Sequence, residues 1–563
     1  MLEYISKIYL NVSCHRKLVI MGIPSYFSHI IKNYPNILRI FSKGTKAFQH
    51  LFMDCNSIIY DEVRKLQEEY TSNHTEFEDE QFENKLIQCV INTIGIYIEY
   101  IQPSEIVYIA FDGVAPFAKM NQQRTRRHKG MITSKINNVI GANENQMKWT
   151  TSHITPGTLF MNKLSNRITK AFGGLENHYG VKKIIVSCSD EAGEGEHKLF
   201  QYVRTHKDTF QDTNMVIYGL DSDLIMLSLF HCEMFKNLYI FRETPEFGKG
   251  ILSEEQCSMD YMYMHIHSLA RAILIEMSCD ECQYFRLYDY MFMCFLLGND
   301  FLPHFPSLNI RTMGIEVLLD NYKKIIGNNS QKMLVSKKKE IEWKWVNQFL
   351  SSLAKDEKKR LLEEYNIRNK MGSRVWNTKT VEERDFMVQS VPIIYRYKED
   401  YIMPHQPYWE NRYYESLFGK ECGYKDIKDI CENYLEGLEW VFKYYTQNCP
   451  DWKWSYHYHY PPLFKDLCQH LPTSKDVRFI NETKETAPFS PYVQLAYVLP
   501  RQSHYLLPPH IETYLSENAS DFYVNQDELR YEWAFCRYFW ESHVLLPSIT
   551  VETLHVWQQK WQK

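Results

Sequence analysis

The sequence predicts an α/β fold with a largely parallel sheet flanked by helices. From residue 21 to about residue 320, short apolar runs alternate with longer segments of helical periodicity. Helical patterns are clearest at residues 82–101 and 194–206. Strands separated by helices indicate parallel pairing, because a parallel pair needs a crossover connection that a helix usually supplies. Four runs have the length and composition of strands: residues 51–54, 106–112, 182–190 and 215–223.

Composition limits the class of protein. The 563 residues are 44% hydrophobic and 24% charged, which excludes a disordered tail, a collagen-like chain and a coiled coil. No apolar run reaches the ~18 residues that a membrane span needs. The formal net charge of −5 gives no global sign of nucleic-acid binding, so the local charge pattern matters more. Because the 14 cysteines have irregular spacing in a long chain without a signal peptide, we expect free thiols in a reducing, intracellular compartment. There is no clear basic nuclear-import run, although KKKE at 337 is a weak one, and we expect a cytoplasmic location in preference to a nuclear one.

Composition also divides the chain into four parts. In the first 20 residues, charged side chains interrupt the apolar positions, so this segment forms no signal-peptide core. Met21 reads as a natural start, and we expect residues 1–20 to be an extension that is either not translated or mobile. The predicted α/β domain covers residues 21–325, followed by a charged helical linker region at 326–400. Residues 401–563 form a second region, rich in aromatic residues and proline.

Acidic residues gather at the ends of the predicted strands and in adjacent turns. Functional side chains are expected just past the carboxyl ends of parallel strands. Bunched carboxylates repel one another and are stable when hard divalent cations neutralise them, and oxygen ligands suit Mg²⁺ or Mn²⁺. Two such ions can activate a water and stabilise the leaving oxygen of a phosphodiester. Any single Asp could instead cap a helix or a turn, but the set predicts a metal site: Asp54, Asp112, Glu194, Glu196, Asp221, Asp223 and Asp300.

A basic helical pattern follows Asp112 directly. Pro116 suits a helix start, and four polar residues then recur at i, i+4, i+7 and i+8, which is one helix face. Arginine can grip a phosphate with two donors, and glutamine adds a neutral donor. The alternative is a solvated basic face, but the position beside a predicted metal ligand favours an anion pocket. Its residues are Lys119, Gln123, Arg126 and Arg127.

Together these residues resemble the Xrn-type 5′→3′ exoribonuclease family, in a short form without the extra C-terminal domains. The resemblance is ordered and runs through nearly the whole chain from Met21. The stretches DGVAPFAKMNQQRTRR at 112 and GNDFLPHFP at 298 are long and specific. Further matches are MGIPSYF at 21, LFMDCNSIIY at 51, ITPGTLFM at 154, GEGEHK at 193, YGLDSDLIMLSL at 218, CPDWKWSYHYHYPP at 449, PFSPYVQLAYVLP at 488 and VLLP at 544.

The resemblance implies a PIN-like, 5′-nuclease core with a second, mostly helical conserved region packed against it. By motif position, the seven acids become catalytic ligands of two Mg²⁺ ions, for which Mn²⁺ can substitute, and the basic face becomes a pocket for a 5′-monophosphate. In the family a His stacks on the terminal base opposite a Trp. Tyr60 occupies the His position here, and Trp454 is the candidate for the opposite face, with Trp452 as its competitor.

The implied activity is processive hydrolysis of 5′-monophosphorylated single-stranded RNA to 5′-mononucleotides by two-metal-ion catalysis. Reading phosphates and base faces predicts little sequence preference. We expect a monomer whose partner is RNA, with no membrane. The alternatives are a structure-specific DNA endonuclease on the same core, a catalytically inactive RNA-binding scaffold and a metal-binding structural protein. The complete acid set argues against the second, and the phosphate pocket argues against the third.

Overall fold

The computed structural model describes most of the chain in nine ranges. They are residues 25–39, 41, 48–73, 78–140, 149–244, 260–472, 477–480, 486–525 and 528–561. Our expectations for residues 1–20 lie outside these ranges. Among the helices that they contain, none is long and apolar enough to cross a membrane. The cysteines in the same ranges form no disulfide.

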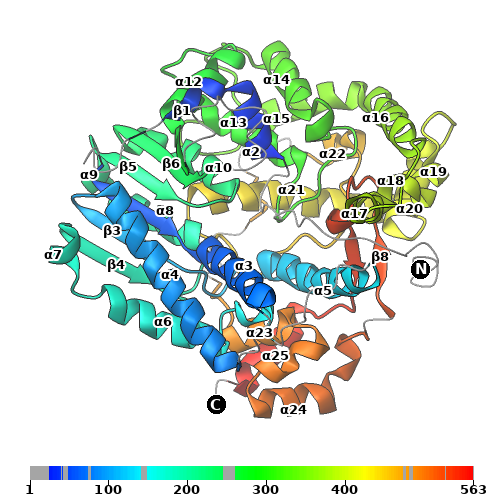
Figure 1. Ribbon diagram of the computed structural model, residues 1–563. Coiled ribbons are helices and arrows are strands. Elements are labelled where there is room, and N and C mark those ends of the chain that lie inside the picture. Colours follow the sequence, from blue (N-terminus) through cyan, green and yellow to red (C-terminus); the bar gives the residue numbers. More distant parts are fainter. Residues whose placement is uncertain are drawn as a thin grey trace.

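A seven-stranded sheet organises the first half of the chain (Figure 1). The strand order is β1-β7-β6-β5-β2-β3-β4. Strands β2 to β6 pair in parallel, whereas β7 is antiparallel to both β6 and β1. The predicted parallel α/β sheet is confirmed, with three further strands that we did not predict. The bounds are β1 (Leu38–Arg39), β2 (His50–Asp54), β3 (Ile106–Ala110), β4 (Lys183–Ser187), β5 (Asn214–Tyr218), β6 (Asn237–Glu243) and β7 (Tyr261–His265).

Helices cover both faces of the sheet. Strand β2 is buried along its whole length, so Leu51 and Met53 pack into one core and Phe52 into the other. Burial on both faces explains why the central strands read as continuous apolar runs. The Leu51 side is covered by α3 (Asn56–Asn73), α4 (Asp79–Ile101) and α6 (Leu159–Phe172). The Phe52 side is covered by α2 (Tyr26–Asn33), α8 (Gly195–Thr205), α10 (Asp223–His231), α12 (Ile266–Glu276) and α13 (Arg286–Cys294).

The rest of the chain is mostly helical. Helix α15 buries Trp343, Val346 and Phe349 in the same core as the Phe52 side of the sheet. The domain boundaries at residues 325 and 400 remain a prediction. The helices are α14 (Gly314–Ile325), α15 (Trp343–Lys355), α16 (Glu357–Gly372), α17 (Val381–Gln389), α18 (Val391–Ile394), α19 (Tyr397–Ile402), α20 (Trp409–Phe418), α21 (Tyr424–Thr446), α22 (Phe464–Gln469), α23 (Pro491–Val498), α24 (Pro509–Asn518) and α25 (Val551–Trp561).

Two long helices join the halves of the molecule. Helix α21 buries its last four turns, and Trp440, Phe442 and Tyr445 belong to the same core cluster as α10. Helix α5 (Phe117–Val139) packs against α23, where Phe117 and Met120 share a core with Val493. Short helices α7 (Glu176–Tyr179) and α9 (Lys207–Phe210), together with 3₁₀ turns, complete the connections of the sheet domain.

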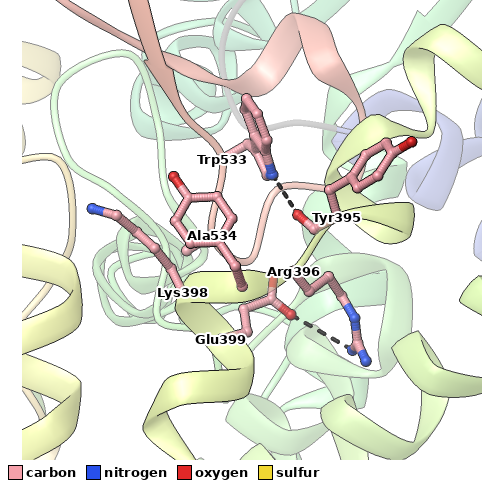
Figure 2. Close-up of a pocket in the computed structure, with 7 residues that line it drawn as sticks. Tyr395, Arg396, Lys398, Glu399, Trp533 and Ala534 are labelled. Carbon is pink, nitrogen blue, oxygen red and sulfur yellow. Dashed lines mark hydrogen bonds and ion pairs between the residues drawn. The ribbon is translucent and has the colours of Figure 1, made fainter. Parts of the chain in front are cut away.

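A C-terminal hairpin closes the far end of α5 (Figure 1). Its strands are β8 (Arg530–Glu532) and β9 (His543–Leu545), and they pack on Ile132 and Ile136 of α5. Figure 2 shows how the segment after β8 is fixed: the Trp533 indole Nε1 donates to the Tyr395 carbonyl at 2.6 Å, beside the Arg396–Glu399 ion pair. The hairpin is therefore anchored to the start of α19.

Candidate active site

The acids that follow strands come together at one edge of the sheet. Asp54 is the last residue of β2, and Asp112 lies two residues past β3. Asp221 and Asp223 follow β5. Since β2 is hydrogen-bonded in parallel to both β3 and β5, these carboxyl ends lie side by side. The sequence expectation for this edge therefore matches the geometry.

The GEGE turn brings two further acids to the same edge. Glu194 is the N-cap of α8, and Glu196 lies in its first turn. The Gly195 backbone N–H donates to Asp112 Oδ1 at 2.7 Å. A Cβ at Gly195 would lie 2.4 Å from Asp54 Oδ1, so only glycine allows this approach of the backbone to the acids.

Asn56 also holds Asp112, and sequence reasoning missed it. Its Nδ2 donates to Asp112 Oδ2 at 2.5 Å, and its Oδ1 accepts from the Asp112 backbone N–H at 3.0 Å. Its position could have indicated this role: Asn56 is an amide side chain two residues past Asp54, at the first position of α3. The two bonds fix the orientation of the Asp112 carboxylate.

Three carboxylates form a group with the dimensions of a cation site. Oxygen atoms of Asp54, Asp112 and Glu196 all lie within 4.8 Å of one another. Within the described structure, the buried Asp54 Oδ1 and Asp223 Oδ1 have no hydrogen-bond partner. Buried oxygens without a donor are costly unless a cation satisfies them. The donor set therefore fits a hard divalent cation, and the cluster supports the use of a divalent metal.

The electrostatics of the cluster lead to the same conclusion. Burial, and then the charges of Asp112 and Asp221, raises the pKa of Asp54 well above its usual range. Burial followed by Glu194 raises the pKa of Glu196, and burial followed by Asp300 raises that of Asp223. Asp221 also has a raised pKa, first through burial. Added positive charge would therefore favour the ionised form of each of these acids.

Lys119 supplies one such charge from the first turn of α5. Its Nζ lies 2.6 Å from Glu194 Oε2 and 2.6 Å from Asp300 Oδ2, and all three side chains are buried. Burial disfavours the ammonium form, but Asp300 and Glu194 outweigh it and raise the pKa of Lys119 well above its usual range. Lys119 therefore joins Glu194 and Asp300, two of the three acids that do not follow β2, β3 or β5.

Helix α21 contributes two tyrosines that sequence reasoning also missed. The Tyr444 hydroxyl donates to Glu194 Oε1 at 2.8 Å, and the Tyr445 hydroxyl bonds to Asp223. Burial raises the pKa of both phenols, so they stay protonated donors. His197 packs its ring on Tyr444, with 3.7 Å between centroids, and its nitrogen is close enough to Glu194 and Glu196 to share a cation. No local pattern in the sequence marks these tyrosines.

The other predicted phosphate ligands lie further along α5. Gln123 is buried, and its Oε1 accepts from Gln494 Nε2 at 3.3 Å. Arg127 is part-exposed and donates to the Ile154 carbonyl at 3.3 Å and to the Thr155 hydroxyl. Arg126 beside it is also part-exposed. Burial lowers the pKa of Arg127 to about 10, as expected for a guanidinium whose described partners are neutral.

The two predicted base-stacking residues differ in their surroundings. Tyr60 on α3 is part-exposed and lies close enough to Arg127 to act on its charge. Trp454 is only 7% exposed, stacks on Trp440 with 5.1 Å between centroids, and donates to Glu436. This packing argues against Trp454 as a base-stacking side chain. Trp452 is part-exposed, and its carbonyl accepts from the Phe117 N–H at the start of α5.

Sequence matches to known proteins extend over nearly all the segments that carry the residues described above. Residues 21–244 match the family model described as XRN 5′-3′ exonuclease N-terminus, and residues 286–401 and 395–560 match the one described as Xrn1 helical domain. The 5′-3′ exoribonucleases 1 of Saccharomyces cerevisiae and Homo sapiens are each 27% identical over 95% of this chain. A Drosophila melanogaster 5′-3′ exoribonuclease 2 homolog is 26% identical over 95% of it. This chain spans 43%, 34% and 70% of those three relatives.

Proposed function

The chain belongs to the Xrn family of 5′-3′ exonucleases, and on that premise we propose that it degrades single-stranded RNA from a 5′-monophosphorylated end. The proposed products are 5′-mononucleotides, released processively by a monomer in the cell interior. One observation carries the proposal: Lys119 binds Glu194 and Asp300 of the acidic cluster and lies on α5, whose next turns carry the other three residues of the predicted phosphate pocket.

We propose that the seven acids hold two Mg²⁺ ions. All their donor atoms are oxygens, which favours Mg²⁺ or Mn²⁺ over zinc. Bound there, the ions would supply an activated water and charge stabilisation for the departing 3′ oxygen. The chain's own residues orient this site: Asn56 and Gly195 fix Asp112, Tyr444 fixes Glu194, and Lys119 holds Glu194 against Asp300.

Arg126 and Arg127 are the proposed main donors to the 5′-phosphate. Both are part-exposed on α5, and the Arg127 guanidinium donates to the neutral oxygens of Ile154 and Thr155. Gln123 and Lys119 are buried beside them and would position the pocket. A terminal phosphate held by two guanidinium groups would be regenerated after each cut, which supports processive degradation.

Tyr60 is the proposed platform for the first base. It lies near Arg127, so a nucleotide whose phosphate reaches Arg127 can place its base on the phenol ring. For the opposite face of the base we propose Trp452 in place of Trp454. Trp452 is part-exposed, and its carbonyl accepts from the Phe117 N–H, which places it beside the start of α5. Stacking accepts any base, so little sequence preference is expected.

A decay assay tests this function. We would incubate 3′-labelled RNA that carries a 5′-monophosphate, 5′-triphosphate or 5′-hydroxyl, with Mg²⁺ or with EDTA. We expect loss of the monophosphorylated RNA alone, only with Mg²⁺, and none with Asp221→Asn. Equal decay of all three ends would refute the phosphate pocket and favour an endonuclease, which labelled DNA flaps would then reveal. No decay under any condition would favour the RNA-binding scaffold.

A further inference from the structure

A cavity of about 240 Å³ lies between α24 and the 3₁₀ turns on either side of it. Its lining comes from the turn Arg501–Leu506, from α24, and from the turn Ser520–Phe522 with the residue after it. One ordered water needs only ~10–15 Å³, and small-molecule sites begin near ~300 Å³. The cavity, which we call the α24 pocket, therefore has room for a small organic molecule.

The α24 pocket is separate from the proposed active site. Its lining residues come from outside the acidic cluster and from outside α5. Figure 1 shows α24 at the lower edge of the molecule, away from the sheet. A ligand bound in this pocket would therefore be additional to the RNA at the sheet edge.

Three buried side chains form the inner wall of the pocket. Leu515, Tyr523 and His504 are 1%, 5% and 7% exposed. The Tyr523 ring packs edge-on to His504, with 4.4 Å between ring centroids, and its hydroxyl donates to the Ala496 carbonyl at 2.8 Å. The phenol is thus already satisfied, so the wall offers a ligand an apolar surface and one imidazole.

His504 brings a polar atom without a partner to this wall. Within the described structure, its buried Nε2 has no hydrogen-bond partner. Burial lowers the pKa of His504 to about 4, against a backbone hydrogen bond to Leu499 that raises it, so the ring is neutral at neutral pH. In a neutral imidazole one nitrogen donates and the other accepts. Because the Leu499 bond uses the donor, Nε2 is an acceptor that lacks an N–H or O–H group.

Two charged side chains stand at the mouth of the pocket. Arg501 and Glu512 are exposed, and within the described structure neither side chain has an ion pair or a hydrogen bond. Ser516 also lines the mouth, and its hydroxyl donates to the Thr513 carbonyl at 2.8 Å, which leaves its oxygen to accept. The mouth therefore offers one positive group and at least two acceptors.

These groups match the parts of a nucleotide. A guanidinium grips a phosphate with two donors. An acidic side chain that accepts from ribose hydroxyls recurs in nucleotide sites. The N–H groups of a base are the donors that an acceptor such as Nε2 needs, and the faces of the base suit an apolar wall.

We propose that the α24 pocket binds a nucleoside 5′-monophosphate, with the phosphate at Arg501, the ribose hydroxyls at Glu512 and a base N–H group at His504 Nε2. The choice of a mononucleotide rests on the proposed function, whose product it is. The pocket and its unpartnered groups do not depend on that function. A free amino acid would match the two charges at the mouth, and the test therefore includes one.

Calorimetric titration with AMP in EDTA tests the assignment. The Arg127→Ala variant serves as background, because it lacks a proposed phosphate donor of the active site. We expect AMP to bind this variant, and ribose 5-phosphate and inorganic phosphate to bind progressively more weakly. Adding Arg501→Ala or Glu512→Ala should weaken AMP binding about 10- to 150-fold, the range for losing one hydrogen bond to a charged group.

A change at His504 tests the contact with the base. His504→Phe keeps a buried aromatic ring and removes Nε2. It should weaken AMP binding about 2- to 12-fold, the range for one neutral hydrogen bond, and leave ribose 5-phosphate unchanged because that compound has no base. An equal loss for both compounds would overturn the placement of the base.

Matched controls and outcomes separate this inference from the proposed function. Glu517→Ala on α24 and Arg374→Ala after α16 change exposed residues of the same types and should leave AMP affinity as it was. AMP binding that Arg127→Ala abolishes and Arg501→Ala preserves would place AMP in the active site and overturn the pocket. So would equal affinities for AMP and phosphate, tighter binding of glutamine, or no binding of any compound, which would leave a cavity filled by water. If the unaltered protein degraded no RNA, the proposed function would fail, and these affinities would still decide on the α24 pocket.

Discussion

Replacing Lys119 by methionine tests how the acidic site is held together. The ammonium group lies 2.6 Å from both Glu194 and Asp300, with 4%, 4% and 5% of the three side chains exposed. Methionine has a similar length and no charge, so two buried carboxylates would lose their shared partner. Breaking a buried ion pair from one side costs about 3–5 kcal/mol. We expect a loss of that size in the free energy of unfolding when EDTA is present.

Divalent cations should return part of that stability. A ligand that binds only the folded state at 100 times its Kd stabilises by about 2.7 kcal/mol. The variant should gain more from Mg²⁺ than the unaltered protein does, because the metal then supplies charge that Lys119 no longer provides. Urea unfolding followed by tryptophan fluorescence, in EDTA and in MgCl₂, measures both quantities.

A surface pair provides the control for this experiment. Lys163 lies 2.7 Å from Glu83 but is 47% exposed, so Lys163→Met should change stability by only about 0–1 kcal/mol. If Lys119→Met in EDTA cost no more than Lys163→Met, the ammonium would not be holding Glu194 and Asp300. A double variant with Asp300→Asn should lose less than the sum of the single changes, because the two residues are in contact.

Three further predictions concern the same site. The folded-state pKa values of Asp54, Glu196 and Asp223 are raised. Their contribution to stability is therefore complete below the unfolded pKa values near pH 4 and is lost as the pH rises through the folded values. Melting curves should show that the stabilisation by Mg²⁺ grows from pH 5 to pH 8, and a stabilisation that stays constant with pH would contradict this. Gly195→Ala places a Cβ 2.4 Å from Asp54 Oδ1 and should lower the rate of RNA decay at least about tenfold. The control Gly130→Ala, whose Cβ meets nothing within 4 Å, should leave the decay rate unchanged and the free energy of unfolding equal or slightly higher. Equal decay rates for the two variants would refute the close approach at Gly195. Arg127→Ala should reduce the preference for a 5′-phosphate over a 5′-hydroxyl end about tenfold or more, measured as the ratio of the two decay rates. The control Arg64→Ala, on the exposed surface of α3, should leave this ratio unchanged.

The sheet edge was predictable from the sequence because strands and acids alternate in a fixed order. An apolar run that ends in an acid places that acid at the carboxyl end of a parallel strand, whatever the rest of the fold does. Asp54 and Asp112 follow this rule, and Asp221 and Asp223 lie past the end of β5, although the predicted run extended to residue 223. The outer strands β6 and β7 were missed, although residues 238–241 and 261–264 are short apolar and aromatic runs.

Contacts between distant segments were not predictable in the same way. Helical periodicity placed Lys119 on one face of α5, but its partner Asp300 comes 181 residues later, and no local pattern joins them. The choice between Trp454 and Trp452 could not be made from the sequence for a related reason. Both lie in the same short motif, and only the packing of Trp454 on Trp440 of α21 shows which of them faces the core.

Helix α21 makes the second region part of the acidic site. Tyr444 and Tyr445 donate to Glu194 and Asp223, acids that belong to the sheet domain. Each carboxylate accepts a neutral donor from α21, which for Glu194 comes 250 residues later, so its orientation depends on how α21 packs against the sheet. A protonated phenol can donate to a carboxylate, and each of these bonds lowers the pKa of its acid against the larger effect of burial, so they favour the ionised acids that a cation needs. The proposed cation site therefore depends on α21 as well as on the sheet, because the sheet edge alone would leave Glu194 and Asp223 without these donors.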